Sequence, residues 1–188
     1  MVTHMTSEVK FIVDEMLGNI ARWLRILGFD TIYARDLRVS YNGKSFDTYL
    51  LRIAILEKRI LITRDKEIVQ RAKHYGVKVI SILQNSKDIV TTLGDILIKS
   101  GVSHPPVNYG ILRCPICNGI LRPIAKENVK TLVPEKSWRF AEEFFKCSNC
   151  GKIYWKGSHW RKISKVIKSL SEILSKNSDH SIKDKQKN

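Results

Sequence analysis

Short apolar runs alternate with amphipathic stretches along the first half of this chain. The runs are rich in the β-branched and aromatic residues that strands favour, and they read VKFIV, TIYA, ILIT and VKVISI, at residues 9–13, 31–34, 60–63 and 77–82. Apolar residues recur at helical spacing between and after them, at residues 16–28, 45–59, 65–76 and 87–101. Because strands separated by helices imply βαβ crossovers, the pattern predicts an α/β fold with a mainly parallel sheet flanked by helices.

The alternation ends at GVSHPPVNYG, residues 101–110, where Gly and paired Pro predict a break. A last helical stretch carries its apolar residues on one face, which predicts a C-terminal amphipathic helix docked on the protein, with Ile163, Val166, Ile167, Leu170, Ile173 and Leu174. The final NSDHSIKDKQKN is polar and predicts a disordered basic tail. We therefore expect four segments: a first domain at 8–103, a small module at 110–158, the helix at 159–176 and the tail at 177–188.

The chain has a formal net charge of +15 at pH 7. Binding a polyanion releases counterions, so this charge favours a nucleic acid as partner, although a basic surface can also aid solubility or bind anionic lipid. No apolar run approaches the roughly 20 residues that span a bilayer, and the N-terminus lacks the apolar segment of a secretory signal. We therefore expect a cytoplasmic location.

All four cysteines lie in the second half, as Cys114-x2-Cys117 and Cys147-x2-Cys150. Two such pairs can supply four thiolates to one tetrahedral zinc ion, with iron as a lesser competitor. The alternatives are two disulfides, which a reducing cytoplasm disfavours, or four unconnected thiols, which the doubled spacing disfavours. Because four cysteines leave no open coordination position, we expect one structural Zn²⁺ that folds a small ribbon.

Basic and aromatic residues are interleaved around the second cysteine pair. Such residues can neutralise phosphates and stack on unpaired bases, which predicts RNA contacts at Lys152, Lys156, His159, Trp160 and Arg161. Arg22 and Arg64 complete the predicted RNA contacts. The alternative for each aromatic residue is burial, as a substitute for a core in a small module.

Acids follow several of the predicted strands. Asp14 and Glu15 follow the first, Asp36 follows TIYA, and Asp65 follows ILIT, while Asp47 lies in the first turn of the helix at 45–59. The carboxyl ends of parallel strands share one edge, where ligands bind. Carboxylates gathered there would repel one another unless a cation compensates, which predicts Mg²⁺ or Mn²⁺ and a nuclease site.

Each acid also has a structural explanation. Asp47 near a helix start interacts well with the helix dipole, and Asp65 can cap the helix that it opens. Glu15, Asp36 and Glu67 are weaker candidates because acids are common in loops. Asp14 and Asp65 are the strongest candidates for metal ligands.

Four segments of the sequence occur in the order of a known family: KFIVDEMLGNIARWLRILGFDTIYARD, RILITRDKEI, RCPICNGILRPI and CSNCGKIYWKGSHW. Over about residues 9–162 they resemble the family named for the carboxy-terminal RNase domain of the Mut-seven mutator exonuclease. The resemblance implies a PIN-like nuclease fold followed by a zinc ribbon. It also implies that Asp14, Asp47 and Asp65 bind the catalytic metal, with Glu67 as a candidate fourth acid.

Two functions follow from these observations. The first is a metal-dependent endoribonuclease, in which Asp14, Asp47 and Asp65 hold Mg²⁺ or Mn²⁺ and the basic ribbon grips the RNA. The second is a weakly active or non-catalytic RNA-binding factor, associated with the ribosome or another ribonucleoprotein. The charge and the ribbon fit both, and the small number of acids near Asp47 fits the second.

Overall fold

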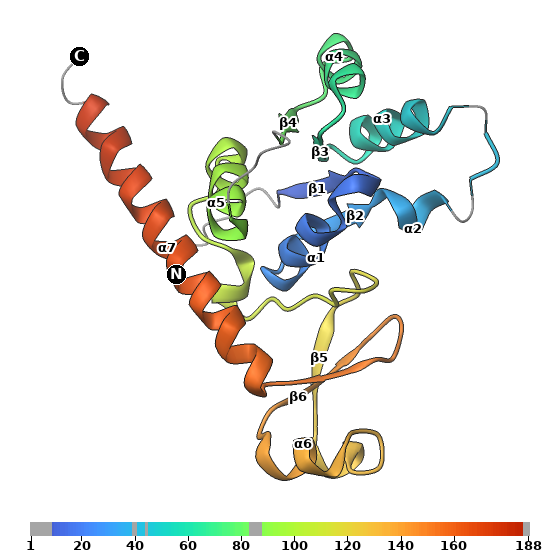
Figure 1. Cartoon of the computed structure of the whole chain (residues 1–188), viewed down its shortest axis with the longest axis vertical. Helices are drawn as coiled ribbons and strands as arrows, with labels where there is room; N and C mark the ends of the chain where they lie inside the picture. The colour runs from blue at the N-terminus through green and yellow to red at the C-terminus, as the bar shows by residue number, and fades with distance from the viewer. Residues whose placement is uncertain (1–8, 39–40, 44, 83–87, 186–188) are drawn as a thin grey trace, which may run out of the picture.

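The computed structural model describes residues 9–38, 41–43, 45–82 and 88–185, which form two sheets and their helices (Figure 1). The strands are β1 Lys10–Val13, β2 Asp30–Tyr33, β3 Ile60–Thr63, β4 Val79–Ser81, β5 Leu121–Ile124, β6 Phe144–Cys147 and β7 Ile153–Trp155. The α-helices are α1 Gly18–Ile26, α2 Ala34–Arg38, α3 Phe46–Leu56, α4 Lys66–His74, α5 Ile89–Ser100, α6 Glu135–Phe140 and α7 Ser158–Lys185. Short 3-10 helices span Glu15–Leu17, Pro106–Tyr109 and Lys126–Val129.

The first sheet has the strand order β2-β1-β3-β4, and every neighbouring pair is parallel. In the central strand β1, Ile12 lies opposite Ile32 of β2 and Leu61 of β3. Both central strands are almost wholly buried, as strands covered by helices on both faces must be. The predicted parallel α/β sheet is confirmed.

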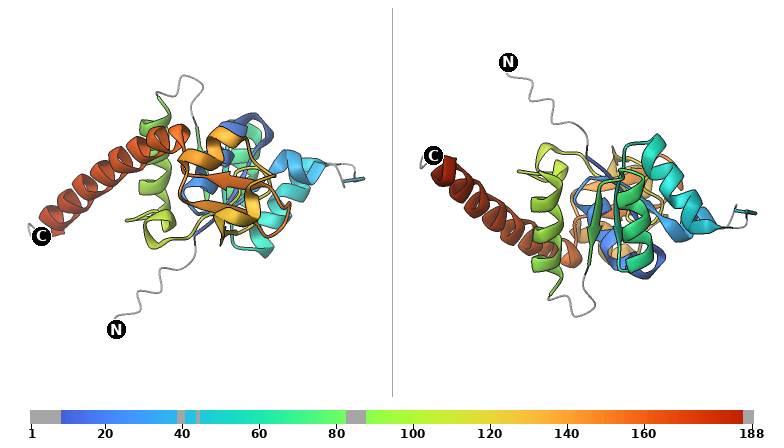
Figure 2. Two further views of the ribbon diagram at one scale, coloured as in Figure 1. Left: turned by 90° about the horizontal axis from the view of Figure 1, so that it is seen from below. Right: turned by 90° about the horizontal axis from the view of Figure 1, so that it is seen from above.

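Alternate residues of β1 point to opposite faces of this sheet and enter different cores. Phe11 and Val13 pack with α1, α5 and α7, whereas Ile12 packs with α3 and α4. Figure 2 shows α5 and α7 on one side of the parallel sheet and α3 and α4 on the other. The carboxyl ends of the central strands therefore lie between two layers of helices.

The second sheet is antiparallel, in the order β5-β6-β7, and belongs to the cysteine-bearing module, which we call the ribbon (residues 110–157). After it, α7 packs along α5, where Leu170 is fully buried. The two helices approach closely, because a Cβ on Gly94 would lie 3.1 Å from a methyl carbon of Ile173. The predicted C-terminal helix therefore docks as expected. Although α7 has 28 residues, no helix in the described ranges is both long and apolar enough to cross a membrane.

Three elements differ from the sequence-based expectation. Ala34, expected at the end of a strand, and residues 35–38, expected as a loop, form α2, and the expected helix at 16–28 begins with a 3-10 turn and ends at Ile26. The expected disordered tail at 177–188 is helical as far as Lys185, and 186–188 lie outside the described residues. The sequence 177–185 contains no Gly or Pro, so nothing stops a helix that is already nucleated. The proposed division into four segments stays a prediction.

Candidate active site and metal centre

The candidate site lies at the carboxyl ends of β1 and β3. The chain leaves β1 for β2 on one side and then crosses to β3 on the other, so the connections diverge between the two central strands. In open α/β sheets this switch point forms the ligand crevice. Asp14 follows β1 there, and its backbone N–H donates to the Ile62 carbonyl at 3.0 Å. The strand pairing therefore fixes Asp14 beside the last residue of β3, Thr63.

Thr63 connects the two acids that the sequence favoured most. Its hydroxyl donates to Asp14 Oδ2 at 2.6 Å and accepts from the backbone N–H of Asp65 at 3.0 Å. Thr63 is fully buried and Asp14 is only 8% exposed, so both side chains are held firmly. The other oxygen, Asp14 Oδ1, accepts from the Glu15 N–H at 2.6 Å and caps the 3-10 turn. Sequence reasoning missed Thr63, although a hydroxyl at the end of a buried strand was a usable signal.

Asp65 both caps α4 and exposes a carboxylate oxygen. Asp65 Oδ1 accepts from the N–H groups of Glu67 at 2.7 Å and Ile68 at 3.1 Å, which satisfies the first turn of the helix. Asp65 Oδ2 has no hydrogen-bond partner within the described part of the chain, and the residue is exposed. The capping explanation is therefore correct, and it leaves one oxygen available for a ligand.

Asp47 lies in the first turn of α3 and pairs with a cation from α4. Its Oδ2 is 3.6 Å from Arg71 Nη1, while Arg71 Nη2 donates to Thr48 Oγ1 at 2.6 Å. Ser45 caps this helix by accepting from the Thr48 N–H at 3.4 Å. Arg71 is thus a cation that faces Asp47 across the gap between the two helices.

Arg38 of α2 lies in the field of several acids of this edge. Its Nε donates to Glu15 Oε1 at 2.6 Å. This hydrogen bond raises the pKa of Arg38 above its usual value, and the charges of Glu15, Asp47 and Asp14 raise it further, against the opposing effect of burial. The charges of Asp14, Glu15 and Asp47 therefore all act on this guanidinium.

The acids do not form a compact metal cage. Among the described residues, the group of three or more acidic, His or Cys ligands whose ligand atoms all lie within 4.8 Å of one another is formed by the cysteines, not by Asp14, Asp47 and Asp65. The positions of these three acids as metal ligands therefore stay a prediction. Of the weaker candidates, Asp36 pairs with Arg25 at 2.9 Å and Glu67 is exposed on α4.

The four cysteines form a site that could hold a zinc ion. Their sulfur atoms all lie within 4.8 Å of one another, with Cys114 and Cys150 3.8 Å apart and Cys117 and Cys147 3.4 Å apart. A tetrahedron with Zn–S bonds of about 2.3 Å has edges of about 3.8 Å, so the donors fit zinc. A Cβ on Gly119 would lie 2.8 Å from Cys147 Sγ, which explains glycine at that position.

The pKa values of two of the thiols, Cys117 and Cys150, are shifted in opposite directions. Burial opposes the thiolate of Cys117, but hydrogen bonds from the Gly119 N–H and from the other cysteines outweigh it and lower its pKa to about 6. The Lys152 N–H favours the thiolate of Cys150, but burial and the neighbouring sulfurs raise its pKa to about 12. A divalent cation would allow all four to ionise.

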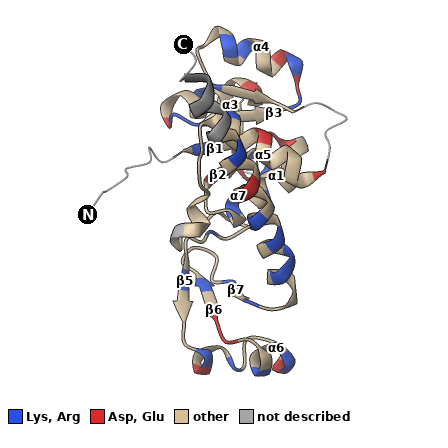
Figure 3. Cartoon of the chain, turned by 90° about the vertical axis from the view of Figure 1, so that its left-hand side faces the viewer, with Lys and Arg blue, Asp and Glu red and all other residues tan. Residues whose placement is uncertain are grey.

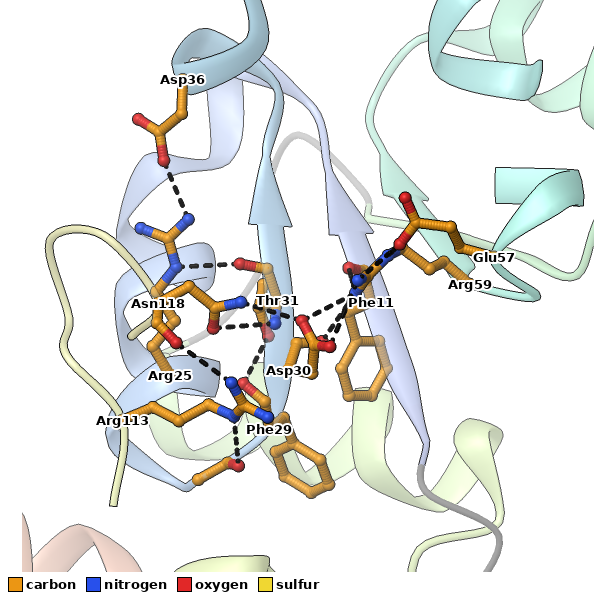
Figure 4. A network of polar contacts seen from close by, with 11 residues as sticks. Phe11, Arg25, Phe29, Asp30, Thr31, Asp36, Glu57, Arg59, Arg113 and Asn118 are labelled. Carbon is orange, nitrogen blue, oxygen red and sulfur yellow. Dashed lines mark hydrogen bonds and ion pairs between the residues drawn. The ribbon is translucent and has the colours of Figure 1, made fainter. Parts of the chain in front are cut away.

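The residue after the first cysteine pair, Asn118, contacts the edge strand β2 (Figure 4). Asn118 accepts from the Thr31 N–H at 3.1 Å through Oδ1 and donates from Nδ2 to Asp30 Oδ1 at 2.8 Å. Arg25, only 3% exposed, donates to the Ile116 carbonyl at 2.7 Å and to the Thr31 carbonyl at 2.9 Å. Sequence reasoning assigned the pair to zinc alone and missed this contact, which fixes the ribbon on the α/β domain.

The predicted RNA contacts are spread over several elements. Arg22 of α1 is exposed and lines a hollow of about 250 Å³, and Arg64, half-buried, follows Thr63. Lys152, His159 and Arg161 are exposed, and Trp160 is half-buried. Lys156 is engaged, since its Nζ lies 2.7 Å from both carboxylate oxygens of Glu143. Contact of these residues with RNA stays a prediction.

Comparison with known proteins identifies the family to which the chain belongs. The family model described as the Mut7-C RNAse domain matches residues 9–167, which include the parallel sheet, both cysteine pairs and the start of α7. Searches of curated proteins and of solved structures found no match. The matched range contains the Asp14–Thr63 edge and the cysteine site together, as the resemblance of the sequence segments predicted. The chain belongs to the Mut7-C RNAse domain family.

Proposed function

We propose that the protein is a metal-dependent endoribonuclease whose active site is the edge of the sheet at Asp14, Asp47 and Asp65. The observation that carries this proposal is the Thr63 hydroxyl, which holds Asp14 and the start of the Asp65 loop together at the switch point. Both acids also cap helical turns, but Asp65 keeps one carboxylate oxygen free beside the buried Asp14, where a shared cation could bind. Membership of an RNase domain family supports the same reaction class.

The residues suit a divalent cation with oxygen ligands. Asp14, Asp47 and Asp65 would hold Mg²⁺ or Mn²⁺, and the ion would lower the pKa of a bound water and offset charge on the phosphodiester. Thr63 orients Asp14, so that this carboxylate loses little freedom on binding. Arg38 and Arg71 pair with Glu15 and Asp47, and a guanidinium released from such a pair would be available to bind phosphate oxygens.

The ribbon and the basic surface would hold the RNA strand. With its cysteines closed around one structural Zn²⁺, the ribbon would supply no chemistry and would be a rigid platform for Lys152 and for the start of α7, which carries His159, Trp160 and Arg161. The net charge of +15 would favour the binding of a polyanion such as RNA. A cytoplasmic location belongs to the same proposal, since thiolates persist under reducing conditions.

A specific observation favours the second candidate, a non-catalytic RNA-binding factor. Asp47 and Glu15 already have arginine partners, and the three acids do not form a compact cluster within the described residues. Such a factor would associate with the ribosome or another ribonucleoprotein. Sedimentation through sucrose at low and high salt separates the candidates, since a free ribonuclease stays near the top of both gradients.

The test of the nuclease is cleavage of a labelled circular single-stranded RNA, which an exonuclease cannot cut. We expect cleavage with Mg²⁺ or Mn²⁺, and a loss of at least about 100-fold in Asp14→Asn and in Asp65→Asn. Asparagine preserves the size and the capping oxygen of Asp65. The matched control is Asp95→Asn, an exposed acid on α5 outside the site. Equal cleavage by wild type and by the Asp14→Asn, Asp65→Asn double variant would exclude these acids from the mechanism.

A further inference from the structure

A hollow of about 170 Å³ lies where the end of α1, the ribbon and the first turns of α7 meet. We call it the aromatic pocket, and its apolar walls are formed by Ile26, Phe145, Tyr154, Trp155, Trp160 and Ile163. All these side chains are partly exposed. The pocket is smaller than the roughly 300–1,000 Å³ of sites for drug-sized ligands, and it therefore suits a single planar ring system.

The aromatic rings of the pocket are held in place by the ribbon. Phe145 and Tyr154 are directly opposed across β6 and β7, so they lie on the same face of that sheet. The Tyr154 hydroxyl contacts Cys114 Sγ at 3.0 Å, which anchors its ring to the cysteine site. Trp160 comes from α7 and, within the described residues, belongs to none of the buried clusters. Its ring is thus not needed to complete a core.

The charges around the aromatic pocket are positive. No acid is among its lining residues, and Arg113, Lys156 and His159 are. Lys156 is 5.3 Å from the centre of the Trp160 ring, although its charge is partly offset by Glu143. The first turns of α7 add Arg161 and Lys162, which are exposed and form no ion pair among the described residues; Figure 3 shows Lys and Arg recurring along this part of α7. An apolar slot with a cationic rim complements a nucleobase and its flanking phosphates.

We propose that the aromatic pocket receives one unpaired nucleobase of an RNA strand, with its phosphates on the cations of the rim. The proposal rests on the proposed function in that RNA is the ligand, but it assigns a site remote from the acids. α1 begins at Gly18, after the 3-10 turn that follows Asp14, and ends at Ile26, so the pocket and the acidic edge lie at opposite ends of this helix of about 12 Å.

The test measures binding rather than cleavage, in Asp14→Asn protein loaded with zinc and without Mg²⁺ or Mn²⁺. The probe is a single-stranded decauridine with one internal 2-aminopurine, whose fluorescence falls when it stacks on an aromatic ring. We expect quenching on binding, and about 5- to 150-fold weaker binding with Trp160→Leu, since base stacking contributes about 1–3 kcal/mol. Trp160→Phe, which keeps an aromatic face, should retain most of the affinity.

The matched control is Phe140→Ala, because Phe140 is an aromatic residue of the ribbon that is 78% exposed and does not line the pocket. Its affinity should equal that of the parent, and a fully paired duplex probe should bind without quenching. Equal affinities of the Trp160→Leu variant and the parent, or an equal loss in Phe140→Ala, would overturn the proposal. Quenching by a protein that cleaves no RNA would support the pocket and reject only the nuclease. RNA cleavage by the wild type, together with no quenching in the binding test, would reject only the pocket.

Discussion

Replacing Asn118 by glycine should detach the first cysteine pair from the edge strand β2 while leaving its backbone unstrained. Asn118 has φ of 66°, in the left-handed region that glycine adopts freely, so the substitution removes the side chain alone. Two contacts disappear, from the Thr31 N–H at 3.1 Å and to Asp30 Oδ1 at 2.8 Å. The backbone carbonyl of residue 118 can still accept from Arg113.

The expected loss of unfolding free energy follows from these two contacts. Thr31 is fully buried, so its N–H loses its acceptor at a cost of about 1–3 kcal/mol. A hydrogen bond to a charged carboxylate contributes about 1.5–3 kcal/mol, but Asp30 is 18% exposed and keeps Arg59, so we take the lower end. The sum is about 2.5–4.5 kcal/mol. With a urea dependence near 3 kcal/mol per molar, the midpoint should fall by about 1 M.

The measurement is urea unfolding of the zinc-loaded protein at pH 7, together with amide exchange of Thr31 by NMR, which should become faster in Asn118→Gly. Asn149→Gly is the matched control, since Asn149 is an exposed asparagine at the second cysteine pair. A midpoint within about 0.2 M of the wild type, or an equal fall in Asn149→Gly, would refute the anchoring role of the Asn118 side chain.

Three further predictions concern the metal, a turn and the acidic edge. Zinc binding at pH 7 should release protons, because Cys150 with its pKa of about 12 must ionise, and the affinity for zinc should weaken as the pH falls to 5. Calorimetry in buffers of different ionisation enthalpy measures this release, and a release of zero would contradict the prediction. Gly28→Ala should destabilise by more than about 2 kcal/mol, because φ is 93° and the new Cβ would lie 2.5 Å from the Ile111 carbonyl oxygen; an unchanged melting temperature would contradict it. Asp65→Ala should lose both cleavage and about 1 kcal/mol of stability, and Asp65→Asn cleavage alone, so equal stability of the two variants would reject the cap.

The features predicted from the sequence are those written in local patterns. A buried parallel strand is recognisable in the sequence as an apolar run, such as ILIT. The residues that directly follow the run lie at the carboxyl end of the strand. The order of amino acids alone therefore places Asp14 and Asp65 at that edge of the sheet. The spacing of Cys114 to Cys117 and of Cys147 to Cys150 indicated one metal site for the same reason, because each turn is set by a few neighbouring residues.

Contacts between distant segments could not be predicted in this way. The sequence gives no sign that Arg71 of α4 meets Asp47 of α3, or that Asn118 reaches β2, because such pairs depend on how helices pack. Thr63 was overlooked because a β-branched residue in a strand needs no further explanation. Its hydroxyl became informative only when the register placed it beside Asp14.

Arginines accompany two of the acids at this edge, in a chain whose net charge is +15. Glu15 and Asp47 have Arg38 and Arg71 as counter-ions. In the proposed nuclease a divalent cation would take over part of this compensation, and each guanidinium would then be available to a phosphate. Metal binding and RNA binding would favour each other, since both draw on the same charges. Affinity for a non-cleavable RNA should therefore rise when Mg²⁺ is added to the wild type, and not when it is added to Asp14→Asn. An RNA affinity independent of Mg²⁺ in both proteins would show that the arginines and the metal act separately.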